Sequence, residues 1–185
     1  MTKVLGLSGS LRRGSYNSAL LRAATRLMPA DATLEVGSIR GIPLYDGDVE
    51  AQGIPASVTQ LKEAIIAADG VLLVTPEYNN SIPGVFKNTI DWLSRPASDI
   101  RRVFGGRSFA ICGTSPGAWG TVLSQAAWLP VMRTLGTQTW FGGRLAVPRA
   151  GSVFDAEGNL KDAAVEDLLR QFLAGYVNFL RRPTA

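Results

Sequence analysis

Short apolar runs alternate with longer amphipathic segments along almost the whole chain, and this alternation restricts the fold more than any other feature. The clearest run, GVLLVT at residues 70–75, is apolar at nearly every position, as expected of a parallel strand covered on both faces. Further strands are predicted at residues 3–8, 33–37, 107–113 and 137–141, and residues 145–147 show a weaker strand pattern. Strands that alternate with helices form a parallel sheet with helices on both faces.

The segments between these strands have helical periodicity. Helices are predicted from about residue 17 to Pro29, after Pro55, and over residues 84–94, 123–135 and 160–180. The last one repeats every four residues, which predicts a buried face of Leu160, Ala164, Leu168, Phe172, Tyr176 and Leu180. Five such units without an internal repeat predict one domain over residues 1–185. The expected fold is a flavodoxin-like α/β three-layer sandwich, whose five-stranded parallel sheet has the order 2-1-3-4-5.

In that order the first, third and fourth strands are neighbours. Each is followed by an unusual loop: SGSLRRGSYNS from residue 8, TPEYNNSIP from residue 75 and TSPGAWG from residue 114. Open α/β sheets bind ligands beyond the carboxyl ends of their strands, at the point where the strand order reverses. We therefore expect the three loops to converge on one binding site.

The first loop has the composition of a phosphate site. Small donors at Ser10, Ser15, Asn17 and Ser18 and the guanidinium of Arg12 lie beside the start of a helix, where oxyanions bind well. The G-K-[ST] of P-loop nucleotidases and the G-x-G-x-x-G of dinucleotide-binding folds are both missing. The alternative is an ordinary polar turn with a helix cap.

The second loop suits a flat heteroaromatic ring. Pro76 stiffens the backbone, Tyr78 offers an aromatic face, and Glu77 and Asn79 can pair with the edge of a ring. The alternative is a capped helix after a long connection. A phosphate site next to a ring site indicates a nucleotide-like cofactor, and these residues favour FMN.

The third loop permits close approach of its backbone to a ligand, at Ser115, Gly117 and Gly120. Trp119, in the same loop, is equally consistent with a flavin neighbour and with a packing or interface residue.

Composition excludes several classes of protein. The chain has no histidine, which removes the commonest general base and the commonest ligand of transition metals, so no metal site is predicted. A net charge of +4 with scattered basic residues does not indicate nucleic-acid binding. No apolar run reaches the roughly 20 residues of a membrane span, and the N-terminus has no signal-peptide pattern. With Cys112 as the single cysteine, we expect a cytoplasmic protein.

Taken together, GSLRRGSYN and PEYNNSIPGVFKNTIDWLS resemble the NADPH-dependent FMN reductase family, including its chromate and quinone reductase branch, and the resemblance covers nearly the whole chain. It implies a homodimer or homotetramer. It also implies that the FMN phosphate lies at Ser10, Arg12, Ser15 and Asn17, and the isoalloxazine at Pro76, Glu77, Tyr78 and Asn79. The chain departs at Thr121 and Leu123, where the quinone and chromate reductases of the family often have glycine and arginine, and at Asn80, where some members have tyrosine. These departures leave the acceptor and the subunit contacts open.

We therefore expect a ping-pong oxidoreductase. NADPH or NADH passes hydride to N5 of FMN and leaves, and a small acceptor such as a quinone, an azo compound, chromate or free flavin then takes the electrons. No side chain is assigned a catalytic role, and Glu77 is expected to orient the site. The alternative is a flavodoxin-type electron carrier, although such carriers tend to be acidic and this chain is basic.

Overall fold

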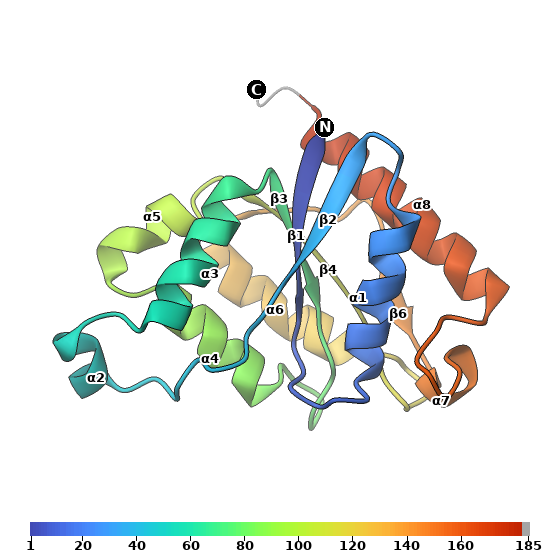
Figure 1. The fold of residues 1–185 in the computed structure, drawn as a ribbon, viewed down its shortest axis with the longest axis horizontal. Coiled ribbons are helices and arrows are strands. Elements are labelled where there is room, and N and C mark those ends of the chain that lie inside the picture. The colour runs from blue at the N-terminus through green and yellow to red at the C-terminus, as the bar shows by residue number, and fades with distance from the viewer. Residues whose placement is uncertain (183–185) are drawn as a thin grey trace.

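The computed structural model describes residues 1–182 and shows a parallel sheet with helices on both faces (Figure 1). Its elements, in chain order, are β1 (Thr2–Ser8), α1 (Tyr16–Leu27), β2 (Ala32–Gly37), α2 (Gly47–Gln52), α3 (Ala56–Ala67), β3 (Gly70–Val74), α4 (Gly84–Leu93), the 3₁₀ helix η1 (Ala97–Asp99), α5 (Ile100–Val103), β4 (Ser108–Thr114), α6 (Val122–Thr134), β5 (Gln138–Thr139), β6 (Leu145–Val147), α7 (Ala150–Val153) and α8 (Ala163–Leu180).

The sheet has the order β2-β1-β3-β4-β5, which confirms the predicted topology. The expected fifth strand is split in two, so the sheet of the described residues has six strands instead of five. β5 pairs with the start of β4 at Ser108, and β6 pairs with its end at Cys112. Residues 140–144 leave the sheet between these two pairings, where Gly142 and Gly143 lie against the ring of Trp140 without room for a Cβ atom.

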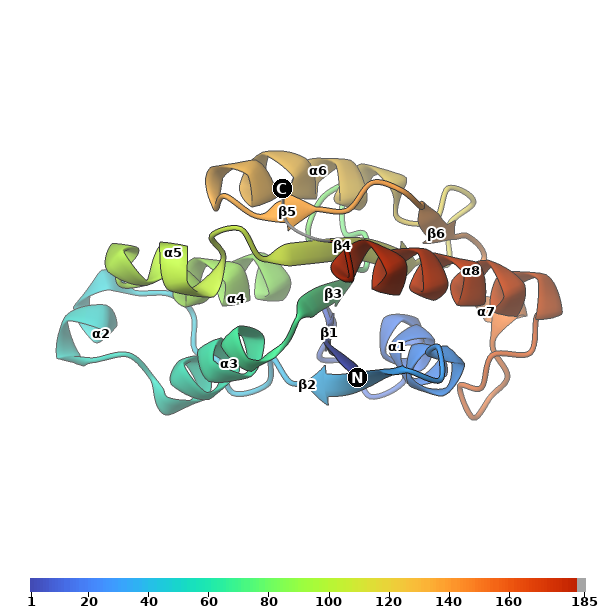
Figure 2. The same ribbon diagram turned by 90° about the horizontal axis from the view of Figure 1, so that it is seen from above.

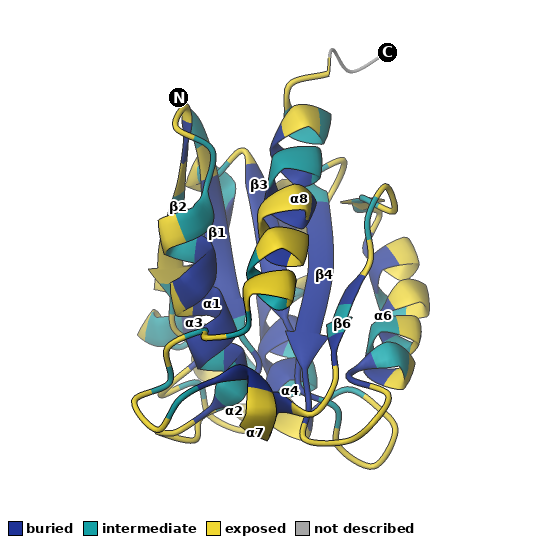
Figure 3. Cartoon of the chain, turned by 90° about the vertical axis from the view of Figure 1, so that its right-hand side faces the viewer, coloured by how far each residue is buried: buried dark blue, intermediate teal, exposed yellow. Residues whose placement is uncertain are grey.

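Two hydrophobic cores fill the space between the sheet and its helices. Figure 2 shows α1 and α8 on one side of the strands and α3, α4 and α5 on the other. Side chains alternate along β3, so that Leu72 and Val74 contact the α1 and α8 core while Val71 and Leu73 contact the α3, α4 and α6 core. β3 is fully buried, as its unbroken apolar sequence predicts (Figure 3).

The predicted buried face of α8 is partly wrong. Phe172 and Tyr176 are buried, but Leu168 is 52% exposed and Leu169 takes its place in the core. The reason is geometric, because four residues advance an α-helix by roughly 40° more than one turn, and a repeat of four drifts away from the core.

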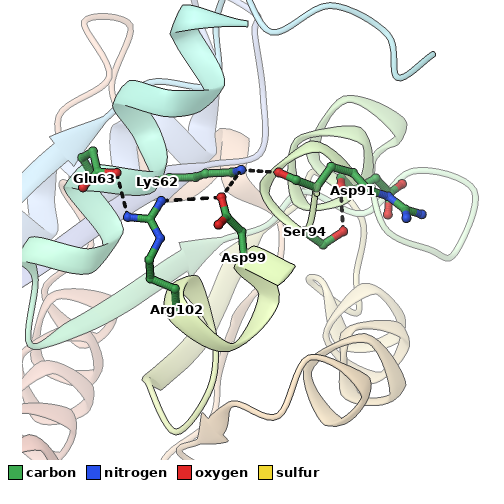
Figure 4. Close-up of polar contacts among 7 residues, drawn as sticks. Lys62, Glu63, Asp91, Ser94, Asp99 and Arg102 are labelled. Atoms are coloured by element: carbon green, nitrogen blue, oxygen red, sulfur yellow. Dashed lines mark hydrogen bonds and ion pairs between the residues drawn. The ribbon is translucent and has the colours of Figure 1, made fainter. Parts of the chain in front are cut away.

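A polar network fixes the connection between α4 and β4. Nζ of Lys62, a residue only 2% exposed, donates to the backbone carbonyl of Arg95 and to Oδ2 of Asp99 at 2.8 Å (Figure 4). Arg102 contacts the same Asp99 oxygen at 3.5 Å and pairs with Glu63 at 2.9 Å. The hydrogen bond from Lys62 holds the pKa of Asp99 below its usual value.

Within residues 1–182, no helix combines the length and apolar character needed to span a membrane.

Candidate functional site

The three loops after β1, β3 and β4 meet at the carboxyl edge of the sheet, as predicted. They enclose a cleft of about 330 Å³, a volume in the range of small-ligand sites. Its lining comes from all three loops and consists of Ser10, Arg12, Ser15, Tyr16, Asn17, Pro76, Glu77, Tyr78, Thr114, Ser115 and Pro116.

The first loop places charge at the start of α1. Ser15 caps this 12-residue helix, because its hydroxyl accepts a hydrogen bond from the N–H of Ser18 at 3.2 Å. The first N–H groups of any helix have no acceptor within the helix, so they are available to a ligand. The guanidinium of Arg12 lies over the ring of Tyr16, 5.5 Å from its centre. An anion in this cleft would therefore meet a positive side chain and the positive end of a helix together.

Asn17 joins the first loop to the third. Its amide nitrogen donates to the carbonyl of Thr114 at 2.8 Å, and its amide oxygen accepts from the N–H of Thr114 at 2.9 Å. Asn17 is buried, so both hydrogen bonds are shielded from water. This residue, predicted to bind phosphate, is thus also a structural tie across the cleft.

The second loop is a short hairpin. Tyr78 and Ser81 form an antiparallel bridge, with N–H to carbonyl distances of 3.1 and 3.0 Å. Between them Asn79 and Asn80 have φ values of 50° and 60°. Two successive left-handed residues are typical of a type I′ turn, in which asparagine is favoured. The two asparagines therefore have a conformational role in this turn.

Glu77 connects the second loop to α6. Its Oε2 accepts hydrogen bonds from the backbone N–H groups of Leu123 and Ser124 at 2.8 and 3.0 Å. A carboxylate at this end of a helix is stabilised by the helix dipole. Below it, the buried hydroxyl of Thr75 contacts the hydroxyl of Ser124 and accepts from the indole N–H of Trp128, at 2.9 and 3.1 Å. Four hydrogen bonds between α6 and residues 75–77 thus hold the second loop in place.

The third loop is held by hydrogen bonds to two of its backbone carbonyl groups. The hydroxyl of Ser115 donates to the carbonyl of Gly120 at 2.6 Å, and the carbonyl of Gly117 accepts from the N–H of Arg149 at 3.0 Å. Gly120 has φ of +63°, and a Cβ there would lie 2.6 Å from the carbonyl oxygen of Ala146. The close approach at Gly120 is therefore to β6.

Four of the predicted site residues do not line the cleft: Ser18, Asn79, Gly117 and Gly120. Ser18 instead contacts the hydroxyl of Ser8 at 2.9 Å. Three lining residues were missed, namely Tyr16, Thr114 and Pro116. The rule that ligands bind beyond the strand ends could have found Thr114, which is the last residue of β4.

Residues 2–152 match the NADPH-dependent FMN reductase family. The chain belongs to this family. It is 43% identical over 180 residues to an NAD(P)H-dependent FMN reductase of Pseudomonas aeruginosa, with 97% of this chain and 96% of the relative covered. A 2-hydroxy-1,4-benzoquinone reductase of Burkholderia sp. is 37% identical over 179 residues, with the same coverage.

Among solved structures, the flavoenzyme NAD(P)H:(acceptor) oxidoreductase FerB of Paracoccus denitrificans superposes with a TM-score of 0.86. It is 32% identical to this chain, and 97% of each chain is covered. Membership of a reductase family confirms the predicted enzyme class and the predicted pair of FMN and NAD(P)H. It disfavours the electron-carrier alternative.

The cleft suits FMN chemically. Among the described residues, Oγ1 of Thr114 is the buried side-chain polar atom without a hydrogen-bond partner, and Thr114 lines the cleft. A buried hydroxyl without a partner costs free energy that a polar ligand can recover. Arg12 and the start of α1 suit a phosphate, while Pro76 and Tyr78 offer flat walls to a ring. The donors and the walls thus match the two ends of the cofactor.

Proposed function

We propose that the chain works as a single FMN-binding domain that oxidises NAD(P)H and reduces a small quinone by a ping-pong cycle. The observation that supports this most strongly is the convergence of three loops on one cleft. It combines the cationic Arg12, the buried Thr114 hydroxyl without a hydrogen-bond partner and the aromatic ring of Tyr78. Two relatives support the choice of acceptor, the benzoquinone reductase of Burkholderia sp. and a quinone reductase of Pseudomonas putida that is 36% identical over 176 residues. Azo compounds, chromate and free flavin are the other candidate acceptors.

When bound, FMN would supply the redox chemistry, accepting hydride and releasing electrons to the acceptor. The chain itself would hold the cofactor and its substrates. We assign the phosphate to Ser10, Arg12 and Ser15, because these side chains line the cleft next to the start of α1. Thr114 and Ser115 would contact the cofactor from the opposite wall. Asn17 would act chiefly through its tie to Thr114.

The ring would rest on Pro76 and Tyr78. Glu77, whose carboxylate is occupied by two backbone N–H groups, would orient the second loop without exchanging protons. Ser18, Asn79, Gly117 and Gly120 would shape the three loops from outside the lining. Substrates need only be held at reacting distance from the ring, so the cycle requires no acid or base from a chain without histidine.

Anaerobic mixing with NADPH or NADH tests the function. The flavin absorbance of the FMN-loaded protein should bleach with the nicotinamide alone and return when benzoquinone is added. A protein that bleaches only with a separate reductase would be an electron carrier, and the proposal would be wrong.

Arg12→Ala tests the site. We expect roughly tenfold weaker FMN binding, because a charge-assisted contact to phosphate is lost, and a smaller difference from the wild type at high salt. Arg26→Ala removes an equal charge from the last turn of α1 and serves as the control. FMN fluorescence quenching measures the FMN affinity of both variants. Equal affinities of Arg12→Ala and Arg26→Ala would mean that the FMN phosphate does not bind at Arg12.

We further propose a homodimer or homotetramer in the cytoplasm. Large apolar side chains are exposed on and beside α6, including Trp119 at 82%, Phe141 at 72% and Leu129 at 43%. Such a group is more typical of an interface than of a free surface. Light scattering coupled to gel filtration measures the mass, and a monomer at micromolar concentration would contradict the assembly.

A further inference from the structure

A second cleft of about 330 Å³ lies on the other side of the loop after β1, between that loop and the end of β2. It shares Ser10 and Arg12 with the FMN cleft, so the two are separated only by the first loop. Part of its wall is apolar, because Leu11 and Val36 are 38% and 52% exposed there. The function described above makes no use of this cleft.

Its charge is strongly positive and uncompensated. Arg12, Arg13, Arg22 and Arg40 all line it, and no acidic residue does so among the described residues. None of these four arginines forms an ion pair within residues 1–182. Glu35 on β2 alternates to the face opposite Val36. Guanidinium groups gathered in one cleft without a counter-charge raise the local concentration of anions.

Arg40 is oriented toward this cleft by the first loop. Its Nη2 donates to the carbonyl of Leu11 at 2.8 Å, and its backbone N–H donates to the hydroxyl of Ser38 at 3.1 Å. The remaining N–H groups of its guanidinium have no partner within residues 1–182. Arg13 is exposed, and its side chain has no hydrogen-bond partner in the same part of the chain. Both side chains can therefore donate to a ligand.

Two further arginines, Arg102 and Arg107, already have partners. Arg102 pairs with Glu63 and Asp99 (Figure 4), and Arg107 donates to the backbone carbonyls of Val103 and Ala68 at 2.9 and 2.8 Å. Arg107 also precedes β4, at the amino end of the sheet, whereas the cofactor loops lie at the carboxyl end. A phosphate group of a substrate has no available guanidinium at Arg102 or Arg107.

We propose that the cleft lined by Arg13 and Arg40 binds the 2′-phosphate of NADPH and gives this enzyme a preference for NADPH over NADH. Arginine binds phosphate groups through paired charge-assisted hydrogen bonds, and an arginine often accommodates this phosphate in nucleotide sites. The apolar wall of Leu11 and Val36 would pack against the adenosine, which an extended dinucleotide carries across the first loop from the flavin. The inference rests on the proposed function, since it takes a nicotinamide dinucleotide as the electron donor.

Direct binding tests the inference without turnover. Calorimetry with the FMN-loaded protein should show adenosine 2′,5′-bisphosphate binding at least about tenfold more tightly than adenosine 5′-monophosphate, the factor expected for one charge-assisted contact. Arg13→Ala and Arg40→Ala should each remove most of this difference. Arg26→Ala, which deletes the same charge outside the cleft, should keep it. Inorganic phosphate is the third ligand, because a general anion site would bind it as well as the bisphosphate.

Kinetics provide the second readout. Arg13→Ala should lower the ratio of kcat/KM for NADPH to that for NADH by about tenfold, with FMN content matched to the wild type. The inference is overturned if the wild type binds the two adenosine nucleotides equally, or if it binds inorganic phosphate as tightly as the bisphosphate. It is also overturned if Arg13→Ala loses kcat/KM equally with NADPH and NADH. Loss of FMN from Arg13→Ala would assign that residue to the FMN cleft instead. If neither nicotinamide bleaches the flavin while the bisphosphate still binds to wild-type protein, the proposed function fails and the anion site stands.

Discussion

Replacing Glu77 with alanine should loosen the joint between the second loop and α6. The change leaves the backbone N–H groups of Leu123 and Ser124 without their carboxylate acceptor, which now lies at 2.8 and 3.0 Å. Leu123 is exposed, so water replaces one of the two hydrogen bonds at little cost. The Ser124 contact is partly buried and resembles the loss of a helix cap, which costs about 1 kcal/mol, and the lost charge at the helix end adds up to about 1 kcal/mol.

The total of about 1–2 kcal/mol corresponds to a fall in Tm of roughly 3–6 °C for a chain of this length. Thermal unfolding of the FMN-free protein, followed by circular dichroism, measures it. Glu77→Gln keeps an acceptor oxygen and should recover about half of the loss. Glu157→Ala removes an exposed carboxylate from the loop before α8 and is the matched control.

FMN affinity should fall together with stability, because the second loop forms the ring wall. Fluorescence titration of Glu77→Ala should show weaker binding than Glu157→Ala at the same salt. Identical melting curves and identical FMN affinities for these two variants would mean that the Glu77 carboxylate does not hold the second loop to α6.

Three further predictions concern the protein around the cleft. Lys62→Met removes the partner of Asp99 and should destabilise the fold by about 3 kcal/mol in urea unfolding. Because the pKa of the paired Asp99 is lowered, the ion pair stabilises the wild type above about pH 4, and this stabilisation is lost as pH falls through the lowered pKa. The free energies of unfolding of the wild type and Lys62→Met should therefore converge in acid. Gly113→Ala would push a Cβ into the carbonyl oxygen of Thr75 and should lower both Tm and FMN affinity, whereas Gly84→Ala, with nothing within 4 Å, should lower neither. Burial raises the pKa of Cys112 to about 12, so its thiol should resist iodoacetamide at pH 8 until the protein unfolds, and rapid labelling of the native protein would contradict this.

The strand order and the meeting of three loops were predictable because they depend on local patterns. Buried strands such as GVLLVT are recognisable from composition, and the right-handed connections of α/β units leave few ways to order them. The split of the fifth strand was not predictable in the same way. It depends on how Trp140 packs against Gly142 and Gly143, which are contacts within an irregular segment.

Within the site, the residues that line the cleft were predicted better than the role of each residue. Arg12, Ser15 and Tyr78 line the cleft, as the composition of the loops indicated. The amide of Asn17 is taken up by Thr114, a partner 97 positions away that no local pattern reveals. Asn79 could have been understood from sequence, since adjacent asparagines between short extended segments indicate a tight hairpin turn.

The tie between Asn17 and Thr114 bears on how the protein meets its cofactor. Because the opposing walls are already joined by two shielded hydrogen bonds, entry of the flavin does not have to organise them, and little of the binding free energy is lost to ordering. Protein stripped of flavin should keep its shape and accept the cofactor again without refolding. The same tie makes the crevice dependent on both halves of the chain, so a fragment that ends before β4 would carry the phosphate loop and yet lack a pocket.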